Sequence, residues 1–289
     1  METQAKGGRA ALVLEGGAMR GLFTAGVIDI WLEAGVTFPA AVAVSAGAVF
    51  GCNLKSGQHG RVLRYNKKYC RDPRYASLRS LLRTGDVFGA QFCYHDIPWK
   101  LDPWDQAAYA ANPMRFFVVA TDANTGEAVY HECAKGDEED IEWFRASASM
   151  PLASRMVPLD GRELSDGGTA DSIPVDFAES LGFGRTVIVL TQPRGFVKVR
   201  AHPWWLYRLC LRRRPALLQA LATRADRYNA TLRAIEAREA AGRAFVLRPP
   251  APLAIPHVSH HPDELQRVYD LGRQVAQSSL PSLQRFLLG

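Results

Sequence analysis

Short continuous runs of apolar residues alternate along the chain with stretches in which apolar residues recur at helical spacing. The run at 10–14 is followed by glycines, which is typical of a buried strand in a parallel sheet. A helical pattern follows over 20–34, and a second strand, over 38–44, leads into small residues that predict another helix. This order of elements predicts a right-handed βαβ unit.

The rest of the chain continues in the same alternation. Further strands are expected at 114–121, 129–133, 186–190 and 245–247, with a turn at 160–162. Helices are expected over 143–149, over 215–242 and from 262 onward, and residues 60–112 predict only short helices and loops. Neither an internal repeat nor a domain boundary is evident, so we expect one continuous α/β domain over residues 1–289 with a mainly parallel central sheet.

Composition excludes several classes of protein. The chain has 289 residues, of which 47% are hydrophobic, and this is enough for a substantial core. No apolar run approaches the roughly 18 residues of a spanning helix, and the N-terminus lacks the apolar core of a signal peptide. We therefore expect a cytoplasmic protein that could touch a membrane peripherally.

The charged and metal-binding residue types add little specific chemistry. The net charge is +6, concentrated around residues 198–214, but no nucleic-acid-binding motif accompanies it and we expect no nucleic-acid partner. The five cysteines include no CxxC pair, which gives no support for a metal site, and reduced thiols are the simplest account. Neither a metal nor an organic cofactor is expected.

A candidate nucleophile lies in the sequence Ala43-Val44-Ser45-Ala46-Gly47, between a predicted strand and a predicted helix. In a nucleophile elbow, small residues two positions before and after the serine let strand and helix meet closely. The following helix N-terminus also favours negative charge beside the hydroxyl. The alternative is that Ser45 only caps this helix, a common role for serine.

A glycine-rich loop joins the first strand to the first helix: Glu15-Gly16-Gly17-Ala18-Met19-Arg20-Gly21. Glycines let backbone N–H groups approach a substrate, so the loop suits an oxyanion hole. Arg20 could orient the loop or engage an anionic substrate group. The loop also fits a relaxed dinucleotide fingerprint, but the second strand ends in Ser45, where that motif needs an acid.

A serine nucleophile needs a base, and none of the seven histidines lies in a recognisable catalytic setting. Asp166 is the better candidate because it follows a predicted strand and precedes Gly167 and Gly168, which allow a sharp turn. Taken alone, this is equally an ordinary Asp-Gly turn.

Together, in this order, the three motifs resemble those of the patatin-like phospholipase family. The family's acidic-Gly-Gly-Gly-x-Arg-Gly loop corresponds to Glu15–Gly21 with Ala18 for the third glycine. Its Gly-x-Ser-x-Gly elbow corresponds to Ala43–Gly47, with Ala43 for the first glycine. Its Asp-Gly-Gly motif corresponds to Asp166–Gly168, and segments 145–151 and 173–175 are also similar to the family. The resemblance covers about residues 10–192 and leaves a helical part at about 200–289.

The resemblance implies a three-layer α/β/α fold and a serine acyl hydrolase acting on lipid esters through a Ser45–Asp166 dyad. It places the oxyanion and substrate-binding loop at Gly16, Gly17, Ala18, Met19, Arg20 and Gly21. Because Ala18 and Ala43 replace glycines, a catalytically weak acyl- or lipid-binding protein on the same fold is the alternative.

One further segment bears on membrane contact. Residues 203–214 combine Trp, Tyr and Leu with several arginines, as in helices that rest on anionic bilayers. The alternative is that these aromatic residues pack on the sheet while the arginines are solvated. The acyl preference and oligomeric state are not specified by the sequence.

Overall fold

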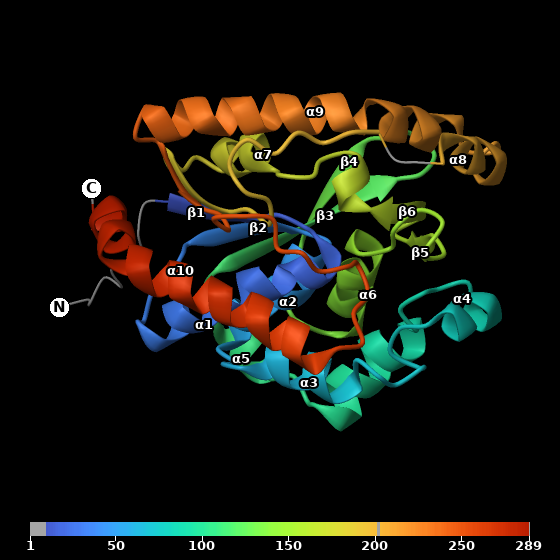
Figure 1. Ribbon diagram of the computed structural model, residues 1–289, viewed down its shortest axis with the longest axis horizontal. Coiled ribbons are helices and arrows are strands. Elements are labelled where there is room, and N and C mark those ends of the chain that lie inside the picture. Colours follow the sequence, from blue (N-terminus) through green and yellow to red (C-terminus); the bar gives the residue numbers. More distant parts are fainter. Residues whose placement is uncertain (1–9, 201–202, 289) are drawn as a thin grey trace.

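The computed structural model describes residues 10–200 and 203–288 and contains one mixed sheet at its centre (Figure 1). The strands follow the order β5-β6-β3-β2-β1-β7-β8, and β4 pairs with β3 outside this path. Their bounds are β1 Ala10–Leu14, β2 Ala40–Val44, β3 Arg115–Asp122, β4 Ala128–Glu132, β5 Val157–Leu159, β6 Arg162–Asp166, β7 Arg185–Val189 and β8 Ala244–Leu247. Every strand expected from the hydrophobic pattern is present.

The central strands β3, β2, β1, β7 and β8 are parallel to one another, as predicted. Their side chains alternate between two cores: Leu12 and Leu14 belong to one cluster, whereas Ala11 and Val13 belong to the other. Both faces of these strands are therefore buried. This explains why the sequence shows continuous apolar runs instead of alternation.

The edge beyond β3 is antiparallel, because β6 and β4 both run against β3. The β5–β6 hairpin turns at Asp160 and Gly161, which have φ angles of 51° and 67°. Such a turn needs positive φ at its central residues, which Asp and Gly tolerate best. The hairpin delivers the end of β6, and with it Asp166, to the carboxyl edge of β2.

Helices cover both faces of the sheet. In Figure 1, α7 and α9 lie along one face, and α1, α2 and α10 lie on the other. The helix bounds are α1 Gly21–Glu33, α2 Ala46–Ser56, α3 Arg61–Tyr69, α4 Leu78–Thr84, α5 Gln106–Ala111, α6 Glu138–Ser147, α7 Val175–Ser180, α8 Trp204–Cys210, α9 Pro215–Ala240 and α10 Pro262–Leu288. This is the expected three-layer α/β/α arrangement.

Some boundaries differ from the sequence-based expectation. The helix predicted at 143–149 begins earlier, as α6, because the Asp137 side chain caps it by accepting a hydrogen bond from the Asp140 N–H. The segment 60–112 also contains the π-helix η2, Phe92–Leu101, besides three α-helices. Within the described ranges no helix is long and apolar enough to cross a membrane.

The C-terminal helix α10 packs directly on α1. A Cβ on Gly26 would lie 2.1 Å from the carbonyl oxygen of Tyr269, and one on Gly272 would lie 2.0 Å from that of Phe23. The Tyr269 hydroxyl donates a hydrogen bond of 2.6 Å to Asp29 on α1. The two helices thus meet backbone to backbone through glycines.

Candidate active site

Ser45 lies in a sharp turn between β2 and α2, with φ of 53° and ψ of −125°. A non-glycine residue in this region is strained, and such strain is concentrated at functional sites. Gly47 is required by packing, because a Cβ there would lie 2.6 Å and 2.7 Å from the carbonyl oxygens of Leu14 and Glu15. The predicted elbow is therefore present, and Ala43 fits within β2 as a fully buried residue.

The Ser45 hydroxyl donates a hydrogen bond to Asp166 Oδ2 at 2.8 Å, although 121 positions separate the two residues in sequence. Asp166 ends β6, and its Oδ1 accepts a hydrogen bond of 2.7 Å from the Gly168 N–H. The structure thus brings together the two residues proposed as nucleophile and base.

Burial raises the pKa of Asp166 above its ordinary value. The positive charge of Arg224 and the hydrogen bonds from Ser45 and Gly168 act in the opposite direction. The Arg224 guanidinium lies close to this loop: a Cβ on Gly168 would be 3.0 Å from its Nη2 and 2.9 Å from Asp166 Oδ1. A side chain at the second position after Asp166 would therefore displace the Asp166 carboxylate or the Arg224 guanidinium.

The segment 145–151 positions both members of the pair. Ser147 accepts a hydrogen bond of 2.8 Å from the Ser45 N–H and donates one of 2.6 Å to the Val119 carbonyl. The Ser149 carbonyl accepts a hydrogen bond of 2.8 Å from the Asp166 N–H. These two serines were not predicted as site residues. Their small-residue segment was noticed only through its resemblance to the family.

The glycine-rich loop passes directly beside Ser45. A Cβ on Gly16 would lie 2.8 Å from the Ser45 Cβ, and one on Gly17 would lie 2.8 Å from Thr191 Oγ1. Ala18 has a φ of 48°, a conformation that favours glycine. Across the described ranges, the N–H groups of Gly17 and Ala18 have no hydrogen-bond acceptor. The loop therefore offers two free donors next to the serine.

The acidic residue that starts this loop holds it in place. Glu15 Oε2 accepts a hydrogen bond of 2.6 Å from the Thr191 N–H, and its Oε1 accepts one of 2.6 Å from the Tyr228 hydroxyl. Tyr228 belongs to α9, so the C-terminal part of the chain reaches the site. No pattern in the sequence predicts this contact.

Two cavities meet at Ser45, and Ala18, Ser45 and Met150 line both. One is an apolar pocket beneath the elbow. Arg61 is the one charged residue among the described residues of its wall, and the other lining residues are Met19, Ala46, Val49, Phe50, Cys52, Tyr65, Tyr75, Phe88, Cys93, Tyr94, Ile97, Pro98, Trp104, Ile141, Phe144 and Ala148. The other, which we call the basic cleft, has a volume of about 480 Å³ and includes Arg20, Lys198, Arg200 and Arg224 in its wall.

The histidines that the structure describes make no hydrogen bond to the serine–aspartate pair. Within the parts of the chain that the structure describes, no histidine hydrogen bonds to Ser45 or Asp166, and His202 lies outside those parts. His257 lines the basic cleft but is exposed.

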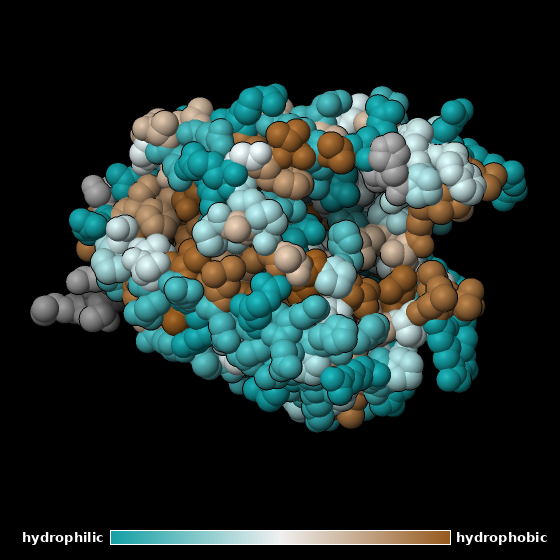
Figure 2. Space-filling model, viewed as in Figure 1, coloured by the Kyte–Doolittle hydropathy of each residue, from teal (hydrophilic) through white to brown (hydrophobic). Residues whose placement is uncertain are grey.

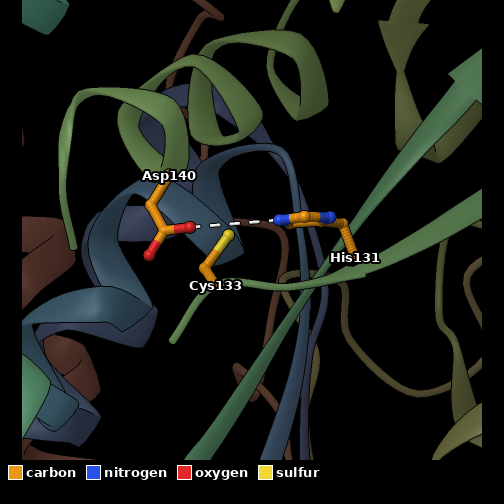
Figure 3. Close-up of side chains that lie close together, drawn as sticks. All are labelled: His131, Cys133 and Asp140. Carbon is orange, nitrogen blue, oxygen red and sulfur yellow. Dashed lines mark ion pairs between the residues drawn. The ribbon is translucent and has the colours of Figure 1, made fainter. Parts of the chain in front are cut away.

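Three metal-binding residue types also come together elsewhere, at the start of α6 (Figure 3). The side chains are His131, Cys133 and Asp140, with Asp140 Oδ1 3.9 Å from His131 Nε2. Asp140 Oδ2 already accepts hydrogen bonds from the N–H groups of Lys135 and Gly136, and His131 stacks on Trp143. Burial raises the pKa of Cys133, which keeps it a thiol. These contacts account for the group as a structural anchor of the loop before α6.

A family model described as patatin-like phospholipase matches residues 12–179, which include the loop, the elbow and Asp166. This is more than half of the chain. The chain belongs to the patatin-like phospholipase family. Membership implies a lipid hydrolase. A second model, described as a domain of unknown function (DUF6363), matches residues 214–288, which contain α9 and α10.

Two curated proteins are similar to this family member. The uncharacterized protein YjjU of Escherichia coli (strain K12) is 28% identical over 302 residues, covering 97% of this chain and 79% of that protein. The patatin-like phospholipase domain-containing protein ZK370.4 of Caenorhabditis elegans is 25% identical over 181 residues, covering 61% of this chain and 13% of that protein.

Two solved structures are also similar. VipD from Legionella pneumophila has a TM-score of 0.42 and 13% identity, and the match covers 93% of this chain and 67% of VipD. The type III effector protein ExoU has a TM-score of 0.41 and 13% identity, over 96% of this chain and 53% of ExoU. The assignment to the family does not depend on these low scores.

Proposed function

We propose that this patatin-like protein is a serine acyl hydrolase of the lipid esterase or phospholipase A type, with Ser45 as nucleophile and Asp166 as base. The observation that carries the proposal is the 2.8 Å hydrogen bond from the Ser45 hydroxyl to Asp166, in a strained elbow at the junction of two cavities. A serine that only capped α2 would need neither feature, and the Ser45 side chain makes no capping hydrogen bond.

The chemistry follows from this geometry. Asp166 accepts the hydroxyl proton as Ser45 Oγ attacks an ester carbonyl, and the free N–H groups of Gly17 and Ala18 stabilise the oxyanion. The carbon–oxygen bond to the alcohol then breaks, and the alcohol leaves with the proton. Water, deprotonated by Asp166, attacks the acyl-enzyme and releases the fatty acid and Ser45.

The raised pKa of Asp166 suits a general base, because a carboxyl group with a higher pKa binds the proton more firmly during attack. The apolar pocket provides a place for the acyl chain. The basic cleft is left for the alcohol part of the ester.

The decisive experiment combines fluorophosphonate labelling with hydrolysis of p-nitrophenyl esters by wild type and Ser45→Ala. We expect the variant to lose labelling and nearly all hydrolysis while it stays folded. Ser56→Ala, at the opposite end of α2, is the matched control and should keep both. Labelling that persists in Ser45→Ala would reject Ser45 as nucleophile. No labelling of wild type would favour the acyl-binding alternative, for which the strained Ala18 is the supporting feature.

We also propose that the cleft mouth rests on a membrane surface. On α8, Trp205 and Leu209 are 65% and 56% exposed, and on α4, Leu78 and Leu82 are 69% and 79% exposed. Both helices project at the same end of the molecule in Figure 1, and Figure 2 shows hydrophobic surface on both sides of the notch between them.

The segment 203–214 is not uniformly available for this contact. Trp204 and Tyr207 pack against a small cluster around Leu217, not against the sheet. Arg214 forms an ion pair with Glu163, which leaves Arg208, Arg212 and Arg213 as the exposed arginines of the segment. Flotation with anionic vesicles should be reduced by Trp205→Ser combined with Leu82→Ser; an absence of wild-type flotation would reject the contact.

A further inference from the structure

The basic cleft gathers four cationic side chains from three separate parts of the chain: Arg20, Lys198, Arg200 and Arg224. Arg20 follows the oxyanion loop, and Arg224 lies on α9. Over the described ranges, none of the four forms an ion pair with a carboxylate. Elsewhere in the molecule, Arg194, Arg238, Arg248 and Arg273 each form such a pair. Four cationic side chains against two carboxylates, Glu15 and Asp166, leave the cleft with an excess of positive charge.

Two carboxylates also line this cleft, Glu15 and Asp166, but both are occupied. Glu15 accepts hydrogen bonds from Thr191 and Tyr228. Asp166 accepts hydrogen bonds from Ser45 and Gly168. Neither is placed to bind a cationic ligand group without giving up a contact that the site needs.

The guanidinium groups at this site have unmet hydrogen-bonding capacity. The Nε atoms of Arg20 and Arg224 are buried and, among the residues that the structure describes, have no hydrogen-bond partner. Leaving a buried donor of a charged group without a hydrogen bond is unfavourable. A bound ligand that supplies an acceptor atom would remove this cost.

Two hydrogen bonds between the Lys198 backbone and the Asn229 side chain on α9 hold Lys198 in the cleft. Its N–H donates to the Asn229 side chain at 2.8 Å, and its carbonyl accepts from Asn229 Nδ2 at 2.9 Å. Its ammonium lies 4.2 Å from the centre of the Tyr228 ring. Burial and the positive charges of Arg224 and Arg20 lower the pKa of Lys198 to about 8, against the effect of Glu15 and Asp166. The cations are thus crowded together at a cost.

From these contacts we propose that the basic cleft binds the phosphate of an anionic lipid headgroup and selects anionic over zwitterionic lipids. This inference rests on the proposed function, in which the acyl chain fills the apolar pocket on the other side of Ser45. A phosphate diester brings oxygen acceptors for the unpaired guanidinium N–H groups. The ammonium of a choline headgroup would instead meet Arg and Lys side chains, with both carboxylates already bonded.

Binding is measured separately from hydrolysis by using Ser45→Ala and isothermal titration with monomeric dihexanoyl phosphatidylglycerol and dihexanoyl phosphatidylcholine. These lipids share acyl chains and phosphate and differ in headgroup charge. We expect the glycerol lipid to bind at least about tenfold more tightly, because both lipids offer the same phosphate and only the choline ammonium is repelled by the cationic side chains. Adding Lys198→Met, which keeps the alkyl stem over the aromatic ring, should remove most of that preference.

The matched control is Arg233→Met, because Arg233 is exposed on the same helix as Arg224 but outside the cleft. It removes one positive charge and should leave the preference unchanged. Equal binding of the two lipids, or an equal effect of Lys198→Met and Arg233→Met, would overturn the inference. Inorganic phosphate that binds as tightly as the glycerol lipid would assign the cleft to free phosphate and reject the lipid headgroup.

Hydrolysis by wild type separates this inference from the proposed function. If Ser45→Ala prefers the anionic lipid but wild type hydrolyses neither lipid, the cleft assignment stands and the hydrolase assignment fails. If wild type hydrolyses both lipids equally and Ser45→Ala shows no binding preference, the hydrolase assignment stands and the headgroup inference fails.

Discussion

The two cavities that meet at Ser45 come from different parts of the chain. The apolar pocket is lined by residues between Ala18 and Met150, all within the part that matches the patatin-like phospholipase model. The basic cleft takes Lys198, Arg200 and Arg224 from beyond that part, and α9, which carries Arg224, lies within the second matched region. Under the proposed function, acyl binding belongs to the shared family core, whereas recognition of the alcohol side depends on the C-terminal part.

The largest expected effect is at the point that both cavities share. Asp166→Asn should lower kcat for a p-nitrophenyl ester by roughly 10,000-fold, the loss typical when the carboxylate of a catalytic hydroxyl system becomes an amide. The fold should persist, since Asn can still accept the Gly168 hydrogen bond. Circular dichroism and single-turnover kinetics check this, and an active Asp166→Asn would remove the base from the mechanism.

A second prediction distinguishes the cavities by size. Ala148→Leu narrows the apolar pocket and should lower kcat/KM for long-chain p-nitrophenyl esters about tenfold relative to the acetate. Ala225→Leu adds the same atoms to the basic cleft and should leave the chain-length profile unchanged. If Ala225→Leu shortened the preferred acyl chain instead, the acyl chain would have to be assigned to the basic cleft and not to the apolar pocket.

A third prediction concerns pH. Because the pKa of Lys198 is lowered to about 8, its charge is present below that pH and is lost as pH rises through it. The preference for phosphatidylglycerol over phosphatidylcholine should therefore decline a few-fold between pH 7 and 9, the size of a partly screened charge interaction. The charged groups facing Lys198 are Glu15, Arg20, Asp166 and Arg224, and the titratable His257 and Tyr228 and the cation Arg200 line the same cleft. Lys198→Met should show the same low preference at both pH values.

The smallest effect is on stability. Ala18 has a left-handed conformation that costs an alanine about 1 kcal/mol, so Ala18→Gly should raise the free energy of unfolding by up to that amount. Urea denaturation measures the change. Ala43→Gly is the control, since Ala43 lies in a fully buried strand and its loss should destabilise instead. A destabilised Ala18→Gly would show that the loop is not strained by the alanine.

The sequence determined much of the fold and the identities of the central residues. Continuous apolar runs required strands buried on both faces, and Gly47 and Gly167 stand where another backbone segment passes too closely for a Cβ. The pairing of Ser45 with Asp166 was implied by the resemblance of the ordered motifs to the patatin-like phospholipase family, because each motif alone fits an ordinary helix cap or turn.

Only the tertiary structure decided what surrounds that pair. Ser147, Tyr228 and Arg224 reach the site from distant elements, and no local pattern distinguishes them from residues that cap a helix or cover its surface. The same holds for Lys198, whose position depends on hydrogen bonds from its backbone to the Asn229 side chain on α9. Turns and strands follow short-range sterics and burial, which residues close together in the sequence determine. The walls of a cavity depend on which remote segments pack beside it, and that is settled only when the whole chain folds.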